Sequence, residues 1–185
     1  MARIVIVRHG NTFAPGETPR RIGARTDPPM VESGRRQARA LAAEFTEREL
    51  TFDRVLCSPL RRTRETAEII APGRIETAGW LREIDHGPDE DRTEAEVIGR
   101  IGQTALDAWE RDAVPPPGWV VESESRLAGW GAFLATATGT ALLVTSNGAA
   151  RFALIAAGLA PAKIRTGAYG VIEDGRLACW DRRPD

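Results

Sequence analysis

The sequence predicts an α/β fold, a three-layer α/β/α sandwich with a mostly parallel central sheet and an antiparallel C-terminal edge. Short apolar runs indicate strands that are buried on both faces, as in a parallel sheet; they lie at residues 4–7, 52–57 and 140–145. Amphipathic segments separate these runs, which predicts helical crossovers that cover both faces of the sheet. Near the end of the chain, two further runs flank Asp174-Gly175, a favoured hairpin turn, and occupy residues 168–172 and 176–180.

The elements of the first half follow from apolar spacing and from residues that favour helix ends. Residues 11–33 are rich in Pro, Gly, Thr and Arg and predict a long irregular loop. Apolar positions at helical spacing predict a helix over residues 34–48. Ser58 is suited to cap the next helix and Pro59 to begin it, so this helix is expected to run from there to Ile70.

The second half is expected to add one short strand, at residues 74–77, and three helices. An apolar face at helical spacing predicts the first of these helices over residues 92–111, before three consecutive prolines. Glycines weaken the next helix, which is expected over residues 122–137. The last helix is expected to follow the strand at 140–145 and to run to Leu159.

Length and composition limit the classes of function. The length of 185 residues matches one domain, so residues 1–185 are expected to form a single domain. The 25 basic and 26 acidic residues give a net charge of −1, which argues against a general affinity for nucleic acid or anionic membranes. The apolar start is too short for a signal peptide, and Cys57 and Cys179 form no disulfide framework. We therefore expect a cytoplasmic protein, whose oligomeric state the sequence leaves open.

The first chemical motif is Arg8-His9-Gly10-Asn11-Thr12, which directly follows a buried strand. Ligands of open α/β sheets bind at the carboxyl ends of strands. Imidazole is a nucleophile that can be phosphorylated, and an adjacent guanidinium neutralises phosphate charge. If His9 is the nucleophile, its other ring nitrogen is expected to donate to a backbone carbonyl, which fixes the attacking tautomer. The alternative is a structural histidine at a strand end.

The second motif is an arginine-rich helix start over residues 58–67. Arginines in the first turn of a helix oppose its dipole, so three of them there favour a bound anion. Arg61 and Arg64 share a face and are expected to pair with acidic residues of the same helix. Arg62 lies on another face, and we expect it to point inward as a phosphate clamp.

The third motif, residues 81–87, offers carboxyl groups in a loop near the strand ends. A phosphatase needs a proton for the leaving oxygen, and a carboxyl group supplies it once its environment raises its pKa. Glu83 and Asp85 are the candidates. The alternative is that both are ordinary surface carboxylates.

Together these segments resemble the histidine phosphatase superfamily, which includes cofactor-dependent phosphoglycerate mutases and many phosphomonoesterases. The order and spacing of the segments match that family as far as about residue 160; the matching segments are residues 7–12, 23–30, 34–38, 58–67 and 81–83. The resemblance implies that His9 is the nucleophile, that Arg8 and Arg62 bind phosphate, and that Glu83 donates the proton. It also places Arg25 at the substrate entrance and makes Asn11 a candidate phosphate contact.

The chain departs from the family pattern after the last core strand. The family has a second histidine there, in a Val-Ser-His-Gly-Gly pattern, whereas residues 144–148 read Val-Thr-Ser-Asn-Gly. Ser146 takes the place of that histidine and donates a neutral hydrogen bond without positive charge. Two hypotheses remain open: Ser146 and the following helix N-terminus bind phosphate well enough, or turnover is slowed or lost. His86 is the only other histidine of the chain.

The sequence thus predicts a phosphomonoester hydrolase that acts through a phosphohistidine on His9 and takes a small phosphorylated substrate. No cofactor and no metal are expected, because arginines supply the positive charge. The alternatives are a non-catalytic phosphate-ligand binder, or phosphoryl transfer of the phosphoglycerate-mutase kind. Mutases of the family are usually longer, so the short segment 87–122 favours a phosphatase. Arg20, Arg21 and Arg25 would suit a substrate with additional negative charge.

Overall fold

The computed structural model describes residues 1–184, and it builds a six-stranded sheet in the order β4-β3-β6-β1-β7-β8. The strands are β1 (Ala2–Arg8), β3 (Arg54–Cys57), β4 (Ile75–Thr77), β6 (Gly139–Thr145), β7 (Tyr169–Glu173) and β8 (Arg176–Arg182). Strands β1, β3, β4 and β6 are parallel, whereas β7 and β8 pair antiparallel at one edge. The predicted fold class, with its antiparallel C-terminal edge, is therefore confirmed.

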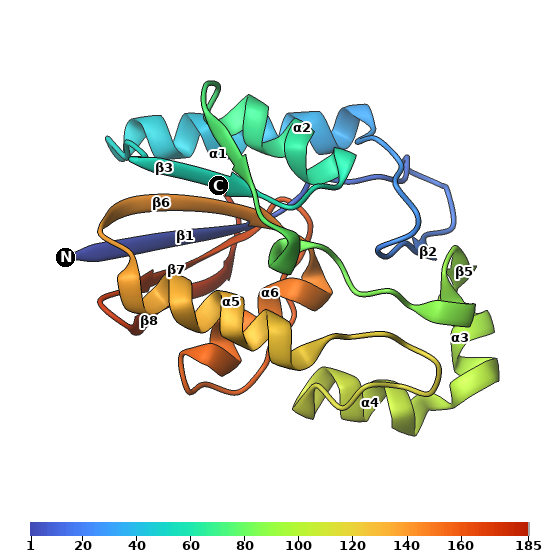
Figure 1. Cartoon of the computed structure of the whole chain (residues 1–185). Helices are drawn as coiled ribbons and strands as arrows, with labels where there is room; N and C mark the ends of the chain where they lie inside the picture. Colours follow the sequence, from blue (N-terminus) through green and yellow to red (C-terminus); the bar gives the residue numbers. More distant parts are fainter. Residues whose placement is uncertain (185) are drawn as a thin grey trace.

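Helices cover both faces of this sheet (Figure 1). One face carries α1 (Glu32–Glu47) and α2 (Arg61–Ile70), and the other carries α5 (Ser123–Thr136) and α6 (Asn147–Ala156). Because strand side chains alternate between faces, β1 contributes to two separate cores. Val5 packs with the α1 residue Leu41 on one face, and Ile6 packs with Trp130 and Phe152 on the other.

Two helices begin or break differently from the prediction. The helix expected to start at Pro59 begins at Arg61, because Ser58 does not cap it. Instead, Ser58 Oγ accepts from the backbone N–H of Leu60 at 3.1 Å and from Thr63 Oγ1 at 3.0 Å, which forms a turn before the helix. The helix expected over residues 92–111 is two helices, α3 (Glu94–Ile101) and α4 (Gln103–Asp112). Gly102 separates them with a φ of 80°, a left-handed conformation that glycine adopts without strain.

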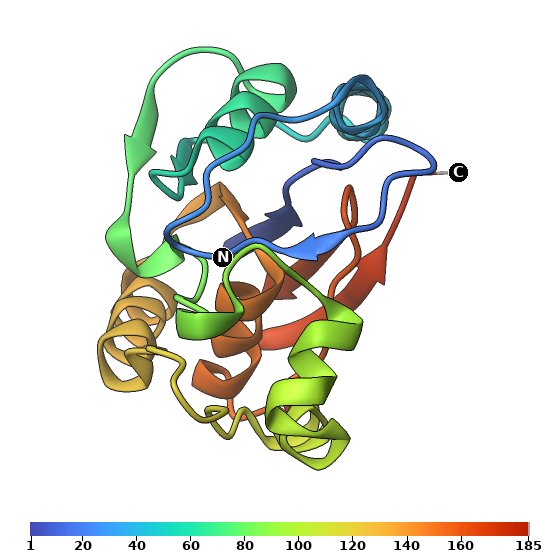
Figure 2. The same cartoon turned by 90° about the vertical axis from the view of Figure 1, so that its right-hand side faces the viewer.

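The long loop after β1 contains a short strand that the sequence did not indicate. Strand β2 (Arg20–Arg21) pairs antiparallel with β5 (Arg92–Thr93). Two 3-10 helices, η1 (Gly79–Leu81) and η2 (Gly87–Asp89), lie in the segment between β4 and β5. Figure 2, turned from the view of Figure 1, shows β2 and its loop crossing in front of the main sheet. The loop is thereby fixed across the carboxyl ends of the parallel strands. Within residues 1–184, none of the helices is long and apolar enough to cross a membrane.

Candidate active site

The candidate residues gather where β1 and β6 end side by side. The two strands are parallel, with Arg8 opposite Thr145 in the register. The backbone N–H of His9 still donates to the carbonyl of Thr145, at 3.1 Å. His9 and Ser146 are therefore the first residues beyond two neighbouring strands, and the sheet itself brings them together.

His9 is buried, and its two ring nitrogens have different partners. Nδ1 lies 2.8 Å from the carbonyl oxygen of Gly10, and Nε2 lies 3.3 Å from Nε of Arg62. A carbonyl only accepts and a guanidinium only donates, so Nδ1 carries the proton and Nε2 carries the lone pair. Burial, together with the charges of Arg62 and Arg8, holds the pKa of His9 well below its ordinary value. The ring is neutral at neutral pH, and the predicted bond from a ring nitrogen to a backbone carbonyl is present.

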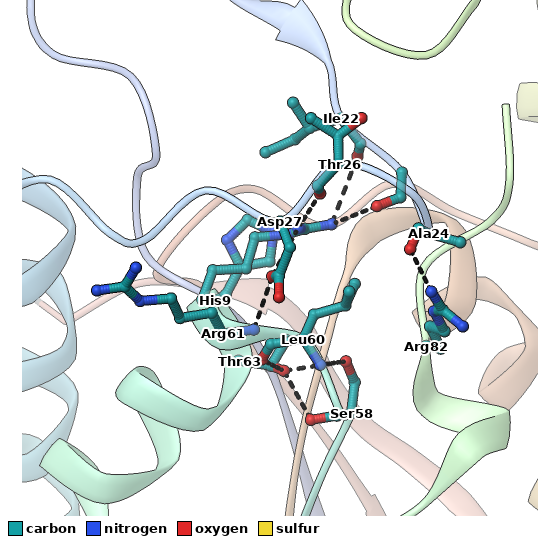
Figure 3. A network of polar contacts seen from close by, with 12 residues as sticks. His9, Ile22, Ala24, Thr26, Asp27, Ser58, Leu60, Arg61, Thr63 and Arg82 are labelled. Atoms are coloured by element: carbon teal, nitrogen blue, oxygen red, sulfur yellow. Dashed lines mark hydrogen bonds and ion pairs between the residues drawn. The ribbon is translucent and has the colours of Figure 1, made fainter. Parts of the chain in front are cut away.

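Arg62 is fully buried on α2 and points toward His9, as the helical geometry predicted. Its guanidinium donates to three carbonyls of the long loop: Thr26 at 2.9 Å, Gly23 at 3.2 Å and Ile22 at 3.5 Å. Figure 3 shows Ile22 and Thr26 of this loop beside His9 and the beginning of α2.

The other two arginines of the motif are exposed. Arg61 pairs with Glu65 at 2.9 Å, as expected. Arg64 forms no ion pair with any residue between 1 and 184, so the predicted pairing of Arg64 is wrong. Among the three, Arg62 alone reaches the histidine.

Arg8 is half-buried beside His9. Its Nη1 donates to the carbonyl of Ile164 at 2.8 Å, while Nε has no hydrogen-bond partner in the described part of the chain. Burial lowers the pKa of Arg8 to about 10, which leaves the group charged at neutral pH. Arg8 therefore offers a charged donor that the protein itself does not satisfy.

Glu83 is buried, and its carboxylate bridges to the start of α6. Oε1 accepts from the backbone N–H of Ile84 at 2.9 Å and Oε2 from that of Gly148 at 3.2 Å. Gly148 is needed for this approach, because a Cβ there would lie 2.3 Å from Oε1. Burial raises the pKa of Glu83, but His86, the two backbone N–H groups and Arg62 together lower it below its ordinary value. The protein without substrate therefore does not supply the raised pKa that a proton donor needs.

Two further predicted residues are engaged elsewhere. Arg25 is exposed and binds Asp85, with Nε 2.9 Å from Oδ1, so both residues brace the loop surface. Asn11 accepts from Thr166 Oγ1 at 2.5 Å and donates to Ser33 Oγ at 3.3 Å. The amide of Asn11 therefore joins the loop before β7 to the first turn of α1, although the residue also lines the cavity that contains His9.

Ser146 and His86 are the buried polar residues whose roles the sequence left open. Neither Ser146 Oγ nor His86 Nδ1 has a hydrogen-bond partner within residues 1–184. The ring of His86 packs edge-on against Trp119, with centroids 4.5 Å apart. Burial lowers the pKa of His86 to about 4, despite the nearby Glu83, so His86 is neutral at neutral pH.

Two cavities meet over Arg8 and Glu83. One cavity, of about 540 Å³, is lined by His9 and is here called the His9 cavity. The other, of about 340 Å³, is lined by His86 and is here called the His86 cavity. The residues common to both are Arg8, Pro19, Arg20, Ile22, Glu83 and Arg165. The rim arginines are already paired: Arg20 with Asp91 at 2.7 Å and Arg21 with Glu94 at 2.5 Å. In the part of the chain that the structure describes, no three His, Cys, Asp or Glu side chains are grouped to hold a metal.

The fold and these motifs define a histidine phosphatase-like site, and the comparison with known families agrees. The model of the histidine phosphatase superfamily (branch 1) matches residues 4–169, so the chain belongs to this superfamily. The probable phosphoglycerate mutases GpmB of Cronobacter sakazakii and Klebsiella pneumoniae are each 34% identical over 130 residues, which is 68% of this chain. The aligned part spans 56% of the length of these relatives.

Solved structures share the fold over nearly the whole chain. The protein TTHB049 of Thermus thermophilus is 27% identical, with a TM-score of 0.73 over 96% of this chain and 98% of that one. The protein of open reading frame Rv3214 of Mycobacterium tuberculosis is 25% identical, with a TM-score of 0.79 over 99% and 98%. A mycobacterial glucosyl-3-phosphoglycerate phosphatase has a TM-score of 0.80 over 98% and 99% but only 22% identity, which shows a common fold.

Two residues that build the site were missed by the sequence analysis. Arg126 is buried on α5 and donates to the carbonyl oxygens of Val121 at 2.6 Å and of Glu83 at 3.2 Å, which anchors the Glu83 loop. Glu90 binds the loop that surrounds Arg62. Both residues lie in segments rich in charged side chains, a pattern that is typical of exposed surface, and no sequence pattern distinguishes them from their exposed neighbours.

Proposed function

We propose that the chain hydrolyses phosphate monoesters through a phosphohistidine at Nε2 of His9. The observation that carries the proposal is the unprotonated Nε2 of His9, a residue that lines the same cavity as Arg8 and Glu83. This Nε2 lies 3.3 Å from the guanidinium of Arg62, which is buried directly behind it. A neutral imidazole with a fixed lone pair is a nucleophile, and two guanidinium groups offset the charge of a phosphoryl group.

The reaction proceeds in two displacements. The N–H of Arg62 Nε turns from Nε2 to a phosphoryl oxygen, which frees the lone pair of Nε2. Nε2 of His9 then attacks phosphorus, the ester P–O bond breaks, and the leaving oxygen takes the proton of Glu83. A water molecule then attacks phosphorus, the P–N bond breaks, and the carboxylate of Glu83 takes the proton of that water. Inorganic phosphate leaves and His9 is again neutral. Arg8 and Arg62 stabilise the charge on the phosphoryl oxygens in both steps.

Substrate binding itself prepares Glu83 as an acid. Before substrate binds, the pKa of Glu83 is low, because the lowering effects of His86 and of the backbone N–H groups of Ile84 and Gly148 outweigh the effect of burial. A phosphate group bound beside the carboxylate adds like charge, which raises that pKa. We infer that Glu83 takes up its proton on or with the substrate.

Ser146 lies at the position where we place the second histidine of the family, and the residue at this position determines the rate of turnover. Its hydroxyl, next to His9 at the strand ends, supplies a neutral hydrogen bond but no charge. We therefore propose slow turnover of a small phosphorylated substrate, without metal or other cofactor. The unpartnered Ser146 favours one alternative, a phosphate-ligand binder that has lost the chemistry. Phosphoryl transfer between substrates would use the same site, as the name of the curated relatives implies for them.

Trapping the intermediate tests the proposal. Incubation with a reactive phosphate donor should label the wild type and His86→Ala with an acid-labile, base-stable phosphoryl group, and His9→Ala should remain unlabelled. Hydrolysis of an aryl phosphate should likewise be lost in His9→Ala. Label at the same stoichiometry in His9→Ala would overturn the role of His9. Vanadate binding without label or turnover in the wild type would establish the binder instead.

A further inference from the structure

The loop of residues 22–26, here called the clamp loop, has Arg62 on one side and Glu90 on the other. The carboxylate of Glu90 accepts from the backbone N–H of Gly23 at 3.0 Å and from that of Arg25 at 3.4 Å. It also accepts from the hydroxyl of Thr26. Three groups of one short loop thus converge on a single carboxylate.

The carbonyls of the same loop point to Arg62. Thr26, Gly23 and Ile22 accept from the guanidinium of Arg62, which in turn donates to Nε2 of His9. Gly23 takes part on both sides, because its N–H binds Glu90 and its carbonyl binds Arg62. The N–H of Gly23 belongs to the same peptide group as the carbonyl of Ile22, so its bond to Glu90 polarises that carbonyl toward Arg62.

The clamp loop has little freedom to shift. A Cβ on Gly23 would lie 2.2 Å from Glu90 Oε1 and 2.2 Å from the carbonyl oxygen of Ile84. The backbone N–H of Ala24 donates to that same carbonyl at 2.9 Å. Glu90 is itself fixed, since Oε1 accepts from the backbone N–H of His86 at 3.2 Å. The position of the loop, and of the guanidinium it holds, therefore depends on Glu90.

We propose that Glu90 is a positioning residue, which fixes the clamp loop so that its carbonyls hold Arg62 against the nucleophile. All the hydrogen bonds of its carboxylate go to groups of the clamp loop and to the backbone N–H of His86, so it acts through the loop. The inference rests on the proposed function, which assigns Arg62 to the phosphoryl group. Through the clamp loop, Glu90 determines how tightly Arg62 binds the phosphoryl group.

Direct binding of vanadate, measured by calorimetry, tests this without requiring turnover. Glu90→Gln keeps the size of the side chain but puts an NH₂ group where two N–H donors now meet an oxygen. It should weaken vanadate binding about tenfold, the effect of losing one to two such bonds. Glu76→Gln is the matched control, because it makes the same substitution at a carboxylate that pairs with Arg54, and neither residue lines the two cavities. It should bind within about twofold of the wild type.

A double-mutant cycle separates positioning from general damage. Arg62→Lys keeps a charge, so binding stays measurable, but lysine lacks the planar fork that the three carbonyls hold. In that background, Glu90→Gln should add less than about a twofold loss. Thr26→Val, which removes one donor to Glu90, should weaken binding in the same direction as Glu90→Gln but by less. Thermal unfolding of each variant verifies that it is folded.

The outcomes distinguish this inference from the proposed function. A wild type that binds neither vanadate nor inorganic phosphate would overturn both. Normal vanadate binding in both folded Glu90→Gln and Thr26→Val would overturn the role of Glu90 alone. An equal loss from Glu90→Gln in the wild-type and Arg62→Lys backgrounds would also overturn it, because the effect would then not pass through Arg62.

Discussion

The two halves of the site, one built on β1 and α2 and the other on β6 and α6, differ in how completely their polar groups are bonded. In the first half, both ring nitrogens of His9 have partners and Arg62 is held by three carbonyls, although Nε of Arg8 has no partner within residues 1–184. In the second half, Ser146 Oγ finds no partner within residues 1–184, and an N–H at the start of α6 is already taken by Glu83.

This contrast shows which part of the site is held in place before a ligand binds. His9 and Arg62, the proposed nucleophile and phosphate clamp, are held in place before any ligand arrives, which is the condition under which electrostatic stabilisation costs least. The β6–α6 half has the neutral hydroxyl of Ser146, and the pKa of Glu83, the proposed acid that binds the start of α6, is lowered in the absence of phosphate. We therefore expect the first half to determine whether phosphate binds and the second half to determine how fast it is released.

The largest effect is expected in the first half. Arg62→Ala removes a buried charge-assisted donor, so kcat/KM should fall about 10³-fold and vanadate inhibition should weaken by a similar factor. Arg61→Ala and Arg64→Ala are the matched controls, since both arginines are exposed on the same helix. Each should change vanadate inhibition less than about twofold. Equal losses at all three positions would mean that a diffuse basic surface binds the anion.

The next effect concerns the acid of the second half. Glu83→Gln should slow an alkyl phosphate about 10²-fold, because an alkoxide leaves poorly without a proton. An aryl phosphate should be slowed far less, since phenolate leaves readily. Equal slowing of both esters would show that Glu83 is not the acid.

The pH profile of the same two esters gives an independent check on Glu83. In the free protein, the pKa of Glu83 is lower than its ordinary value, because the effects of His86, the backbone N–H groups and Arg62 together outweigh the effect of burial. Above that pKa, Glu83 is deprotonated. The acid form is lost as pH rises, so kcat/KM for the alkyl ester should decline from the acidic range upward. The aryl ester should not show this decline. His9 imposes no acid limb near neutrality, because its pKa lies well below its ordinary value.

The fold was predictable because its strands are apolar runs and its helices have one apolar face. The strands β1, β3 and β6, the turn at Asp174-Gly175 and the inward direction of Arg62 all follow from such local patterns. The break at Gly102 and the later start of α2 were missed, since both depend on which local hydrogen bonds Ser58 and the glycine form.

The candidate site was predictable in part, for a physical reason. His9, Arg8 and Glu83 lie at strand ends or next to them, where the topology of the sheet determines their position. Glu90 and Arg126 act through backbone carbonyls and N–H groups that come from distant segments, and no side-chain pattern records such contacts. The lowered pKa of Glu83 was unpredictable for the same reason.

The smallest effect expected is a gain, and it bears on the difference between the two halves. Ser146 retains a neutral hydrogen bond, so the deficit relative to a charged donor should be on the order of 10-fold. Ser146→His should recover that factor in turnover if the ring fits, because bound phosphate raises the pKa of an imidazole beside it. Ser146→Ala is the matched control and should be slower than the wild type, as it removes the remaining donor.

The test is the steady-state turnover, on one monoester, of these variants, of His86→Ala and of the Ser146→His/His86→Ala double variant. His86, with a pKa of about 4, is neutral and should contribute little charge. If Ser146→His is no faster and His86→Ala abolishes turnover, His86 has taken over the role, and the second half is as complete as the first.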